Sequence, residues 1–299
     1  MLRLAQAAVL VIGILMPAVL SANAPVILPA KRAVSAHTQL VVFVPGGKVP
    51  PEDYIALLNA TQQSSQTNFI TAIVRCGKLN LCNPLTSLNG EIAAAIAAAV
   101  QVNGGKAFAP TDIFVAGHSL GGVGARHYVD TNKNIPYAGL MLFGTQYNGD
   151  HEDYLGTLGY PINLEKFRIP LLVLVGELDK LPISHAALLY KQYASMSPVD
   201  QAKKPVVVVP GMDHSQFCSP FQVRGDLKAE ISNNDAIRLS SSVIASFIDA
   251  QNVFEKPDVR SSAAIAMQNN VNNWTKPILS AWIEAADMET SKWCVDGQK

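Results

Sequence analysis

One serine lies between glycines at a position where a role in chemistry explains it better than packing does. Residues 115–128 read VAGHSLGGVGARHY: an apolar run, the turn Gly117-His118-Ser119-Leu120-Gly121, and then a helical pattern. Glycine on both sides suits a tight turn in which larger side chains would collide. At the start of a helix, the serine oxygen stands clear of the strand, where developing negative charge is favoured. The pattern therefore predicts that Ser119 is a nucleophile on an elbow turn.

A serine hydroxyl reacts poorly unless a base accepts its proton and an acid orients that base. With this elbow, the acid and the histidine follow later strands, in the order Ser, acid, His. The run LLVLVGELDKL supplies Asp179, three residues after its last glycine, and Glu177 is the less favoured rival. The run VVVVPGMDHSQF supplies His214, and none of the other five histidines follows a last strand. The predicted catalytic residues are therefore Ser119, Asp179 and His214.

Such a reaction also needs hydrogen-bond donors for the oxyanion that forms at the attacked carbonyl. One predicted donor is the backbone N–H of Leu120, the residue after the nucleophile. The second should come from the loop after the early strand LVVFV, which begins Pro45-Gly46-Gly47. Glycine lets a backbone approach a carbonyl oxygen closely, so the second donor is Gly46 or Gly47.

The elements that would hold these residues are continuous apolar runs with helical stretches between them. Runs that do not alternate with polar residues indicate strands buried on both faces, as in a parallel sheet. Residues 91–101 place Ile92, Ile96 and Val100 on one stripe of a helix, and residues 235–251 also repeat at helical spacing. The order predicts an α/β fold: a doubly wound, mostly parallel sheet with helices on both faces. The runs are Leu40–Val44, Phe69–Val74, Ile113–Gly117, Leu140–Gly144, Leu171–Gly176 and Val206–Gly211.

Two segments lie outside this regular pattern. Residues 146–168 form either a small lid over the site or a solvated connection. Residues 252–299 follow the last predicted core helix and contain three tryptophans and a cysteine, so they are expected to be a C-terminal extension docked on the catalytic domain, residues 25–251. Tyr54, Tyr147 and Phe221 are aromatic residues that could line a substrate pocket.

Residues 1–24 have the layout of a secretory signal peptide. Arg3 precedes an apolar run from Ala7 to Leu20, and small residues end at Ala24, after which cleavage is expected. A membrane anchor is the alternative, but the apolar run is short for a span of about 20 residues. The predicted location is therefore secreted, or the lumen of the secretory pathway. With 23 Lys+Arg and 23 Asp+Glu, the net charge is zero, which disfavours a nucleic-acid partner.

The four cysteines form an even set, and an exported chain favours disulfides. Spacing favours the pairs Cys76–Cys82 and Cys218–Cys294, with Cys82–Cys218 as a rival. No cysteine pair has the spacing of a zinc site, and the sequence has no His-Glu-x-x-His motif. The acidic residues Asp150, Glu152 and Asp153 with His151 could hold a cation, but an exposed polar loop is the favoured interpretation. The acceptor triplets that begin at Asn59 and Asn273 are compatible with glycosylation.

Taken together, the sequence resembles the α/β-hydrolase superfamily, with the character of a lipase or esterase. The resemblance extends from about Gln39 to Gln251 and rests on the segments PGG, GHSLGG, GELD and PGMDH. One departure is the oxyanion loop, which begins Pro45-Gly46-Gly47 where many lipases and esterases have His-Gly-Gly. The resemblance implies transfer of an acyl group to Ser119, proton transfer by His214, and no cofactor.

The expected function is therefore that of a secreted serine hydrolase that cleaves carboxylic esters through a Ser-Asp-His triad and an acyl-enzyme. The implied partner is a small-molecule or lipid ester, with contact to a lipid surface as a further expectation. Two alternatives remain open at this point. The same triad can transfer the acyl group to an acceptor other than water, and a protein with this fold can be a binding module without catalysis.

Overall fold

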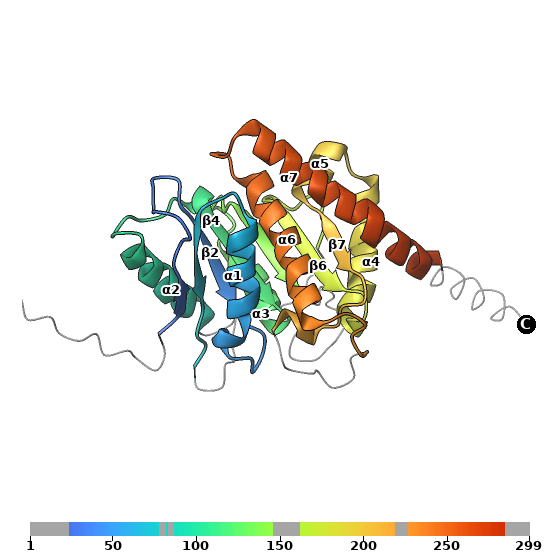
Figure 1. The fold of residues 1–299 in the computed structure, drawn as a ribbon, viewed down its shortest axis with the longest axis horizontal. Coiled ribbons are helices and arrows are strands. Elements are labelled where there is room, and N and C mark those ends of the chain that lie inside the picture. The colour runs from blue at the N-terminus through green and yellow to red at the C-terminus, as the bar shows by residue number, and fades with distance from the viewer. Residues whose placement is uncertain (1–23, 78–81, 83–86, 146–161, 219–226, 285–299) are drawn as a thin grey trace, which may run out of the picture.

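One seven-stranded sheet forms the centre of the protein (Figure 1). The computed structural model describes residues 24–77, 82, 87–145, 162–218 and 227–284. The strand order is β1-β3-β2-β4-β5-β6-β7, in which β1 pairs antiparallel with β3 and all other neighbours are parallel. The strands are β1 (Val26–Leu28), β2 (Gln39–Val44), β3 (Phe69–Ile73), β4 (Ile113–His118), β5 (Gly139–Phe143), β6 (Leu171–Gly176) and β7 (Val206–Val209).

The six apolar runs of the sequence all form strands, and every residue of β2 to β7 is buried. Burial on both faces explains why these runs are continuous rather than alternating. The predicted doubly wound α/β fold is therefore confirmed. β1 was not predicted, because its three residues lie between Pro25 and Pro29 and are too few to show a pattern.

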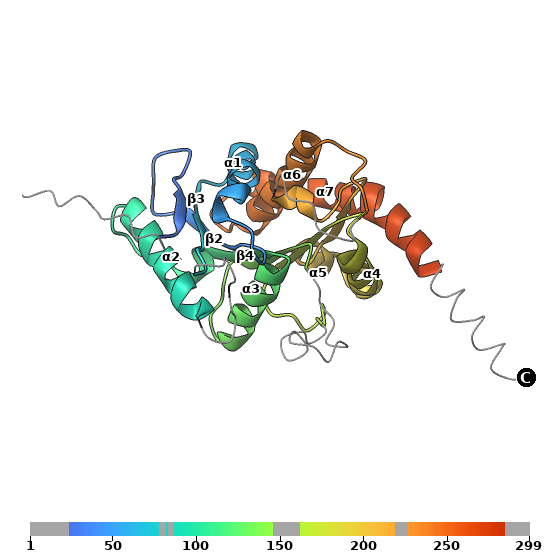
Figure 2. The ribbon, with the colours of Figure 1, turned by 90° about the horizontal axis from the view of Figure 1, so that it is seen from below.

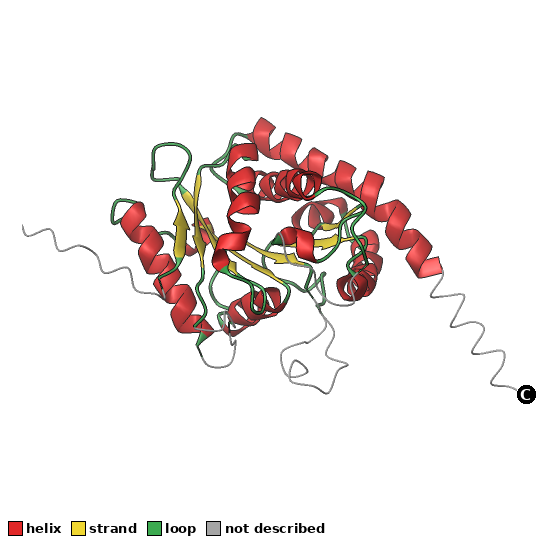
Figure 3. Cartoon of the chain, turned by 60° about the horizontal axis from the view of Figure 1, so that its bottom comes forward, coloured by secondary structure: helices red, strands yellow, loops and turns green. Residues whose placement is uncertain are grey.

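Helices cover both faces of the sheet (Figures 2 and 3). α1 and α6 pack together on one face, while α2 and α3 pack on the strands of the other face, and α4 packs on β6 and β7. The helices are α1 (Ile55–Ser64), α2 (Leu88–Val102), α3 (Leu120–Thr131), α4 (Lys180–Ser195), α5 (Pro198–Lys203), α6 (Asn233–Gln251) and α7 (Pro257–Asn270). Short helices are η1 (Pro51–Tyr54), η2 (Pro110–Asp112), η3 (Ser215–Phe217) and the π-helix η4 (Val271–Thr275). Among the described residues, no helix combines the length and apolarity needed to cross a membrane.

The buried stripe of α2 differs from the expected one. Ile92 is fully buried as predicted, but Ala95 and Ala99 share that face, whereas Ile96 and Val100 are only half-buried. Alanine lets a helix axis approach a sheet closely, so the face with the smaller side chains turns inward. The larger apolar side chains then lie at the margins of the contact.

The described part of the C-terminal segment packs on α6 and on the edge strand β7. α7 lies along α6, η4 contacts β7, and residues 276–284 continue as a helix. The backbone N–H of Val208 donates a hydrogen bond of 2.9 Å to Oγ1 of Thr275, which satisfies a group that an edge strand would otherwise expose. Trp274 packs against the core, whereas Trp282 is 46% exposed. Trp293 and Cys294 lie outside the described residues.

The parallel register brings the carboxyl ends of the central strands to one edge of the sheet. Gly117 lies opposite Leu142, and Gly176 lies opposite Val209. Two backbone hydrogen bonds extend this alignment past the strand ends, from Ser119 N to Phe143 O and from Glu177 N to Val209 O, at 2.9 and 3.0 Å. The loops after β2, β4, β5, β6 and β7 therefore converge, and residues distant in sequence meet there.

Candidate active site

Ser119 occupies the turn between β4 and α3 in a strained backbone conformation. Its φ is 53° and its ψ is −125°, values that a residue with a side chain rarely adopts. Such a conformation costs on the order of 1–3 kcal/mol and persists only where the surrounding structure holds it. Ser119 is partly exposed, although the strand residues before it are buried. The turn therefore presents the hydroxyl at the surface of the sheet edge.

Close backbone contacts explain the glycines around Ser119. A Cβ atom on Gly117 would lie 2.4 Å from the carbonyl oxygen of Gly121, and one on Gly121 would lie 2.2 Å from that of Pro45. A Cβ on Gly122 would lie 1.9 Å from Oγ1 of Thr145. The elbow thus packs directly against the loops after β2 and β5, which brings the nucleophile next to the predicted oxyanion loop.

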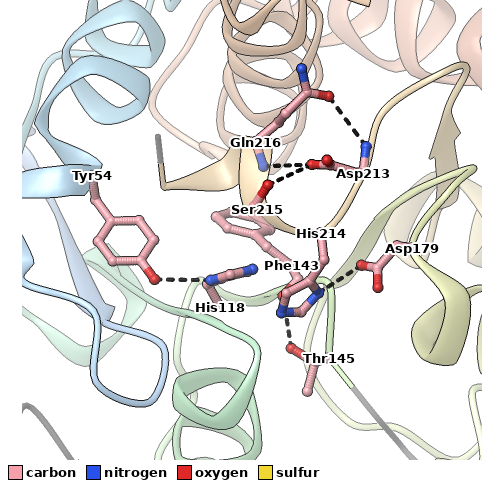
Figure 4. A network of polar contacts seen from close by, with 9 residues as sticks. All are labelled: Tyr54, His118, Phe143, Thr145, Asp179, Asp213, His214, Ser215 and Gln216. Atoms are coloured by element: carbon pink, nitrogen blue, oxygen red, sulfur yellow. Dashed lines mark hydrogen bonds and ion pairs between the residues drawn. The ribbon is translucent and has the colours of Figure 1, made fainter. Parts of the chain in front are cut away.

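His214 and Asp179 are in contact, although 35 residues separate them (Figure 4). His214 lies in the loop after β7, and Nδ1 of its ring is 2.9 Å from Oδ2 of Asp179. The Asp179 side chain is only 2% exposed and that of His214 is 12% exposed. A carboxylate in this position accepts the Nδ1–H proton, so the tautomer inferred from the contact leaves Nε2 as the basic nitrogen.

Glu177, the rival acid, has a different partner. Its Oε2 accepts a hydrogen bond of 2.9 Å from the backbone N–H of Gly211. A Cβ on the preceding residue, Gly176, would lie 2.2 Å from the carbonyl oxygen of Met212. Glu177 therefore ties the loop after β6 to the loop after β7, and the structure places Asp179 against the histidine.

Asp213 organises the loop that carries His214; of the two roles that its position in the sequence suggests, a solvent-facing residue or a turn cap, it has the second. This carboxylate is buried, and its Oδ1 accepts hydrogen bonds from Oγ of Ser215 at 2.8 Å and from the backbone N–H of Gln216 at 3.0 Å. The Asp213 N–H in turn donates to Oε1 of Gln216 at 3.2 Å. These reciprocal bonds cap η3 and hold the backbone on both sides of His214.

Gly144 is a residue that sequence reasoning missed. It follows β5 with φ of 49°, and a Cβ there would lie 2.8 Å from Oδ2 of Asp179 and 2.9 Å from Nδ1 of His214. Any side chain at this position would push the acid and the histidine apart. The run LMLFG contains the signal, because its glycine ends a buried strand at the catalytic edge.

Gly144→Ala should lower kcat for ester hydrolysis by about 100-fold, because the added methyl group displaces the Asp179–His214 pair. The matched control is Gly104→Ala, which also has a positive φ, of 68°, but would meet no atom within 4 Å. Steady-state kinetics and thermal unfolding of both variants separate the loss of stability caused by a side chain at positive φ from the loss of activity caused by displacing the pair. If both variants lose stability equally and both keep full activity, the contact with the pair does not matter.

The predicted oxyanion donors differ in whether their backbone N–H groups already have a hydrogen-bond partner. Leu120 begins α3, so its N–H is among those that a helix leaves without an intrahelical partner. The N–H of Gly46 is already committed, because it donates a hydrogen bond of 2.9 Å to Oη of Tyr54. Gly47 is partly exposed, and its N–H makes no hydrogen bond to the part of the chain that the structure describes. Of the two glycines, Gly47 is therefore the better candidate.

Of the suggested pocket residues, Tyr54 does not reach solvent at all. Its exposed fraction is 0%, so it belongs to the interior beneath the site. Tyr147 and Phe221 lie outside the described residues, as do residues 146–161, most of the segment considered as a lid.

The disulfide predictions are half right. Cys76 and Cys82 form a disulfide, with Cα atoms 4.8 Å apart. Cys218 is a free, buried thiol, so the pairing with Cys294 and the rival pairing with Cys82 are both wrong. Cys82 is already used, and Cys218 points into the core beside Tyr54, where the phenol is its polar neighbour. Sequence spacing carries no information about that direction.

Cys218 should resist alkylation in the folded protein, because burial raises the pKa of its thiol to about 12. At pH 8 only on the order of 10⁻⁴ of such a thiol is ionised, and the thiolate is the reactive form. Peptide mapping after iodoacetamide should show Cys218 unmodified in the native protein and modified in denaturant without reductant. Cys82 is the control, since it should react only after reduction. Modification of Cys218 in the native protein would contradict its burial.

Comparison with protein-family models identifies the family of this chain. The family model described as "Alpha/beta hydrolase family" matches residues 40–238. The chain therefore belongs to the alpha/beta hydrolase family. The match includes the elbow serine, Asp179 and His214. No curated protein sequence matches the chain.

Solved structures with a similar fold include several esterases and lipases. A carboxyl esterase 2 from the mycorrhizal fungus Tuber melanosporum is 14% identical, with a TM-score of 0.47 over 75% of this chain and 85% of that chain. A hormone-sensitive lipase from a metagenome library is 17% identical, with a TM-score of 0.48 over 73% and 80%. The esterase domain of a Rhodothermus marinus protein is 14% identical, with a TM-score of 0.45 over 75% and 96%.

Proposed function

We propose that this protein is a serine hydrolase that cleaves carboxylic esters through an acyl-enzyme on Ser119. The observation that carries the proposal is the contact of 2.9 Å between His214 and the buried carboxylate of Asp179, at the edge of the sheet that also presents Ser119. A base oriented by an acid, at the same edge of the sheet as a serine on a strained turn, suits acyl transfer. Membership of the alpha/beta hydrolase family supports the same reaction class.

In the proposed reaction, Oγ of Ser119 attacks the ester carbonyl carbon while Nε2 of His214 accepts the hydroxyl proton. Asp179 stabilises the imidazolium that forms. The N–H groups of Leu120 and Gly47 donate hydrogen bonds to the oxyanion. When the tetrahedral intermediate collapses, the carbon–oxygen bond to the alcohol breaks and His214 returns the proton to that alcohol. A water molecule, deprotonated by His214, then attacks the acyl-enzyme; the bond between the acyl carbon and Oγ of Ser119 breaks, His214 returns the proton to Oγ, and the acid is released.

The deciding experiment treats the purified protein with a fluorophosphonate probe and measures hydrolysis of p-nitrophenyl esters of increasing acyl length. A serine hydrolase should label on Ser119, release p-nitrophenol in repeated turnovers, and release free acid. Product analysis with an added alcohol decides between water and another acceptor, since an acyltransferase would make the new ester in preference to the acid. A protein that neither labels nor hydrolyses any ester is a binding module, and the proposal is then wrong.

Export through the secretory pathway is part of the proposal. The Cys76–Cys82 disulfide suits an oxidising compartment, and residues 1–24 have the layout of a signal peptide. The mature protein should begin at Pro25 when its N-terminus is sequenced from the culture medium of cells that express the full chain. Membrane-bound protein that retains Met1 would contradict export with cleavage. Glycosylation at Asn59 and Asn273 stays a prediction, tested by a mass shift after glycosidase treatment.

A further inference from the structure

A fully buried tyrosine connects the loop after β2 to the residue beside the nucleophile. Tyr54 is the last residue of η1, and no part of it reaches solvent. Its Oη lies 2.9 Å from the backbone nitrogen of Gly46. It also lies 2.9 Å from Nδ1 of His118 (Figure 4). His118 is the last residue of β4 and directly precedes Ser119. One hydroxyl group therefore joins both strand ends that frame the proposed oxyanion site.

One arrangement of protons pairs the Tyr54 hydroxyl with both Gly46 and His118. A phenol donates one hydrogen bond and accepts two. The backbone N–H of Gly46 can only donate, so Oη of Tyr54 is the acceptor in that hydrogen bond and keeps its own proton for another partner. We assign the phenol proton to Nδ1 of His118, which accepts it in the neutral tautomer that carries the ring proton on Nε2. In this assignment the Tyr54 hydroxyl is paired with both groups, while the buried Nε2 of His118 has no hydrogen-bond partner in the part of the chain that the structure describes.

Burial keeps His118 in that neutral form. The ring is 1% exposed, and burial together with the nearby His214 holds the pKa of His118 well below its usual range. The His118 ring centroid lies 4.5 Å from that of His214 and 5.2 Å from that of Phe217. A neutral His118 places no second positive charge against His214 when His214 carries the proton during acyl transfer. Its ring also supports the face of the base.

The loop that Tyr54 holds is fixed on both sides of Gly46. The carbonyl oxygen of Gly46 accepts a hydrogen bond of 3.2 Å from the N–H of Val49, which closes a turn, and Lys48 in that turn has φ of 64°. A Cβ on Gly46 would lie 2.9 Å from Oη of Tyr54, so only glycine fits beneath the loop. With both polar groups of Gly46 bound, the next peptide N–H, that of Gly47, has a set direction.

We propose that Tyr54 and His118 are positioning residues for the oxyanion site: the chain from His118 to Tyr54 to Gly46 aligns the Gly47 N–H with the Leu120 N–H on the reacting carbonyl. This inference rests on the proposed function, because it assigns a role in the same acyl transfer. Neither side chain touches the substrate. They act by holding the loop after β2 in register with the elbow, so that the two donors meet at one oxygen.

Tyr54→Phe removes only the hydroxyl group and is the first test. We expect kcat for a p-nitrophenyl ester to fall by about 10- to 100-fold with KM within about 2-fold, since the lost alignment acts on the transition state. The matched control is Tyr193→Phe, which also removes a hydroxyl from a buried tyrosine, one bonded to Oε1 of Gln268 at 3.1 Å between α4 and α7. That variant should keep kcat. Active-site titration with the fluorophosphonate expresses kcat per folded site.

A second pair of variants tests the acceptor on His118. In His118→Asn, the amide oxygen can take the place of Nδ1 and accept the phenol proton, so kcat should stay within about 5-fold of wild type. In His118→Leu, no acceptor remains, and kcat should fall as far as in Tyr54→Phe. The double variant of Tyr54→Phe with His118→Leu should have a kcat no lower than either single variant, because both substitutions remove the same hydrogen bond.

A sulfur substitution in the substrate separates oxyanion alignment from a general structural effect. A thionoester carries C=S in place of C=O, and sulfur accepts hydrogen bonds poorly, so it gains little from the oxyanion donors. The ratio of ester to thionoester turnover should therefore fall about 10-fold or more in Tyr54→Phe and stay unchanged in Tyr193→Phe. An unchanged ratio in Tyr54→Phe, or kcat equal to wild type, overturns the positioning role.

Failure of the proposed function would look different. If the wild-type protein hydrolyses no ester, the rate of fluorophosphonate labelling at Ser119 still reports the alignment, because the phosphonyl oxygen occupies the oxyanion position. Slower labelling of Tyr54→Phe than of Tyr193→Phe would then support the positioning role without ester hydrolysis. Equal rates of labelling for the two variants, or no labelling of the wild type, would overturn it.

Discussion

Ser119→Ala and His214→Ala should each lower kcat/KM for ester hydrolysis by on the order of 10³-fold or more. The first removes the attacking oxygen, and the second removes the group that accepts its proton. Neither change disturbs the fold strongly, since alanine is smaller than either residue and Ser119 and His214 are both partly exposed. Both variants should therefore unfold within a few degrees of the wild-type temperature.

The controls for this pair are Ser195→Ala, on the exposed end of α4, and His127→Ala, a half-buried histidine on α3. Both should keep near-wild-type activity. The double variant of Ser119 and His214 should be no less active than either single variant, because residues that act as one unit are not additive. Near-full activity in Ser119→Ala would remove the acyl-enzyme from the mechanism.

Asp179→Asn should lower kcat by on the order of 10³-fold, with little change in KM. The asparagine fits the same space, but it cannot stabilise an imidazolium, and its amide can donate to Nδ1 and so impose the wrong tautomer on His214. Glu177→Gln should leave kcat within about 3-fold, because the amide oxygen can still accept the hydrogen bond from Gly211.

The two acids are separated by one residue, so this comparison is a sharp one. Steady-state kinetics of both variants, each titrated with the fluorophosphonate, gives the answer directly. A large loss in Glu177→Gln together with a small loss in Asp179→Asn would exchange the assignment. It would also mean that the contact between Asp179 and His214 does not persist during turnover.

Local sequence determined the parts of this protein that depend on neighbours along the chain. Continuous runs of Val, Leu and Ile are buried on both faces wherever they occur, so six strands could be predicted without knowing their order. The Gly117–Gly121 turn is equally local, because crowding between a strand and the helix after it demands glycine. The order of the motifs then predicted Asp179 and His214 as partners of Ser119.

Tertiary structure alone decided which groups meet at the edge of the sheet. The sequence contains the glycine after β5 and the tyrosine of η1, but their contacts depend on the strand order, which places Gly144 against Asp179 and His214 and Tyr54 against Gly46 and His118. The sequence also could not predict the state of Cys218, because spacing along the chain does not give the direction of a side chain. Its thiol is free and points inward. Contacts between distant loops follow from strand order and register, which side-chain periodicity does not encode.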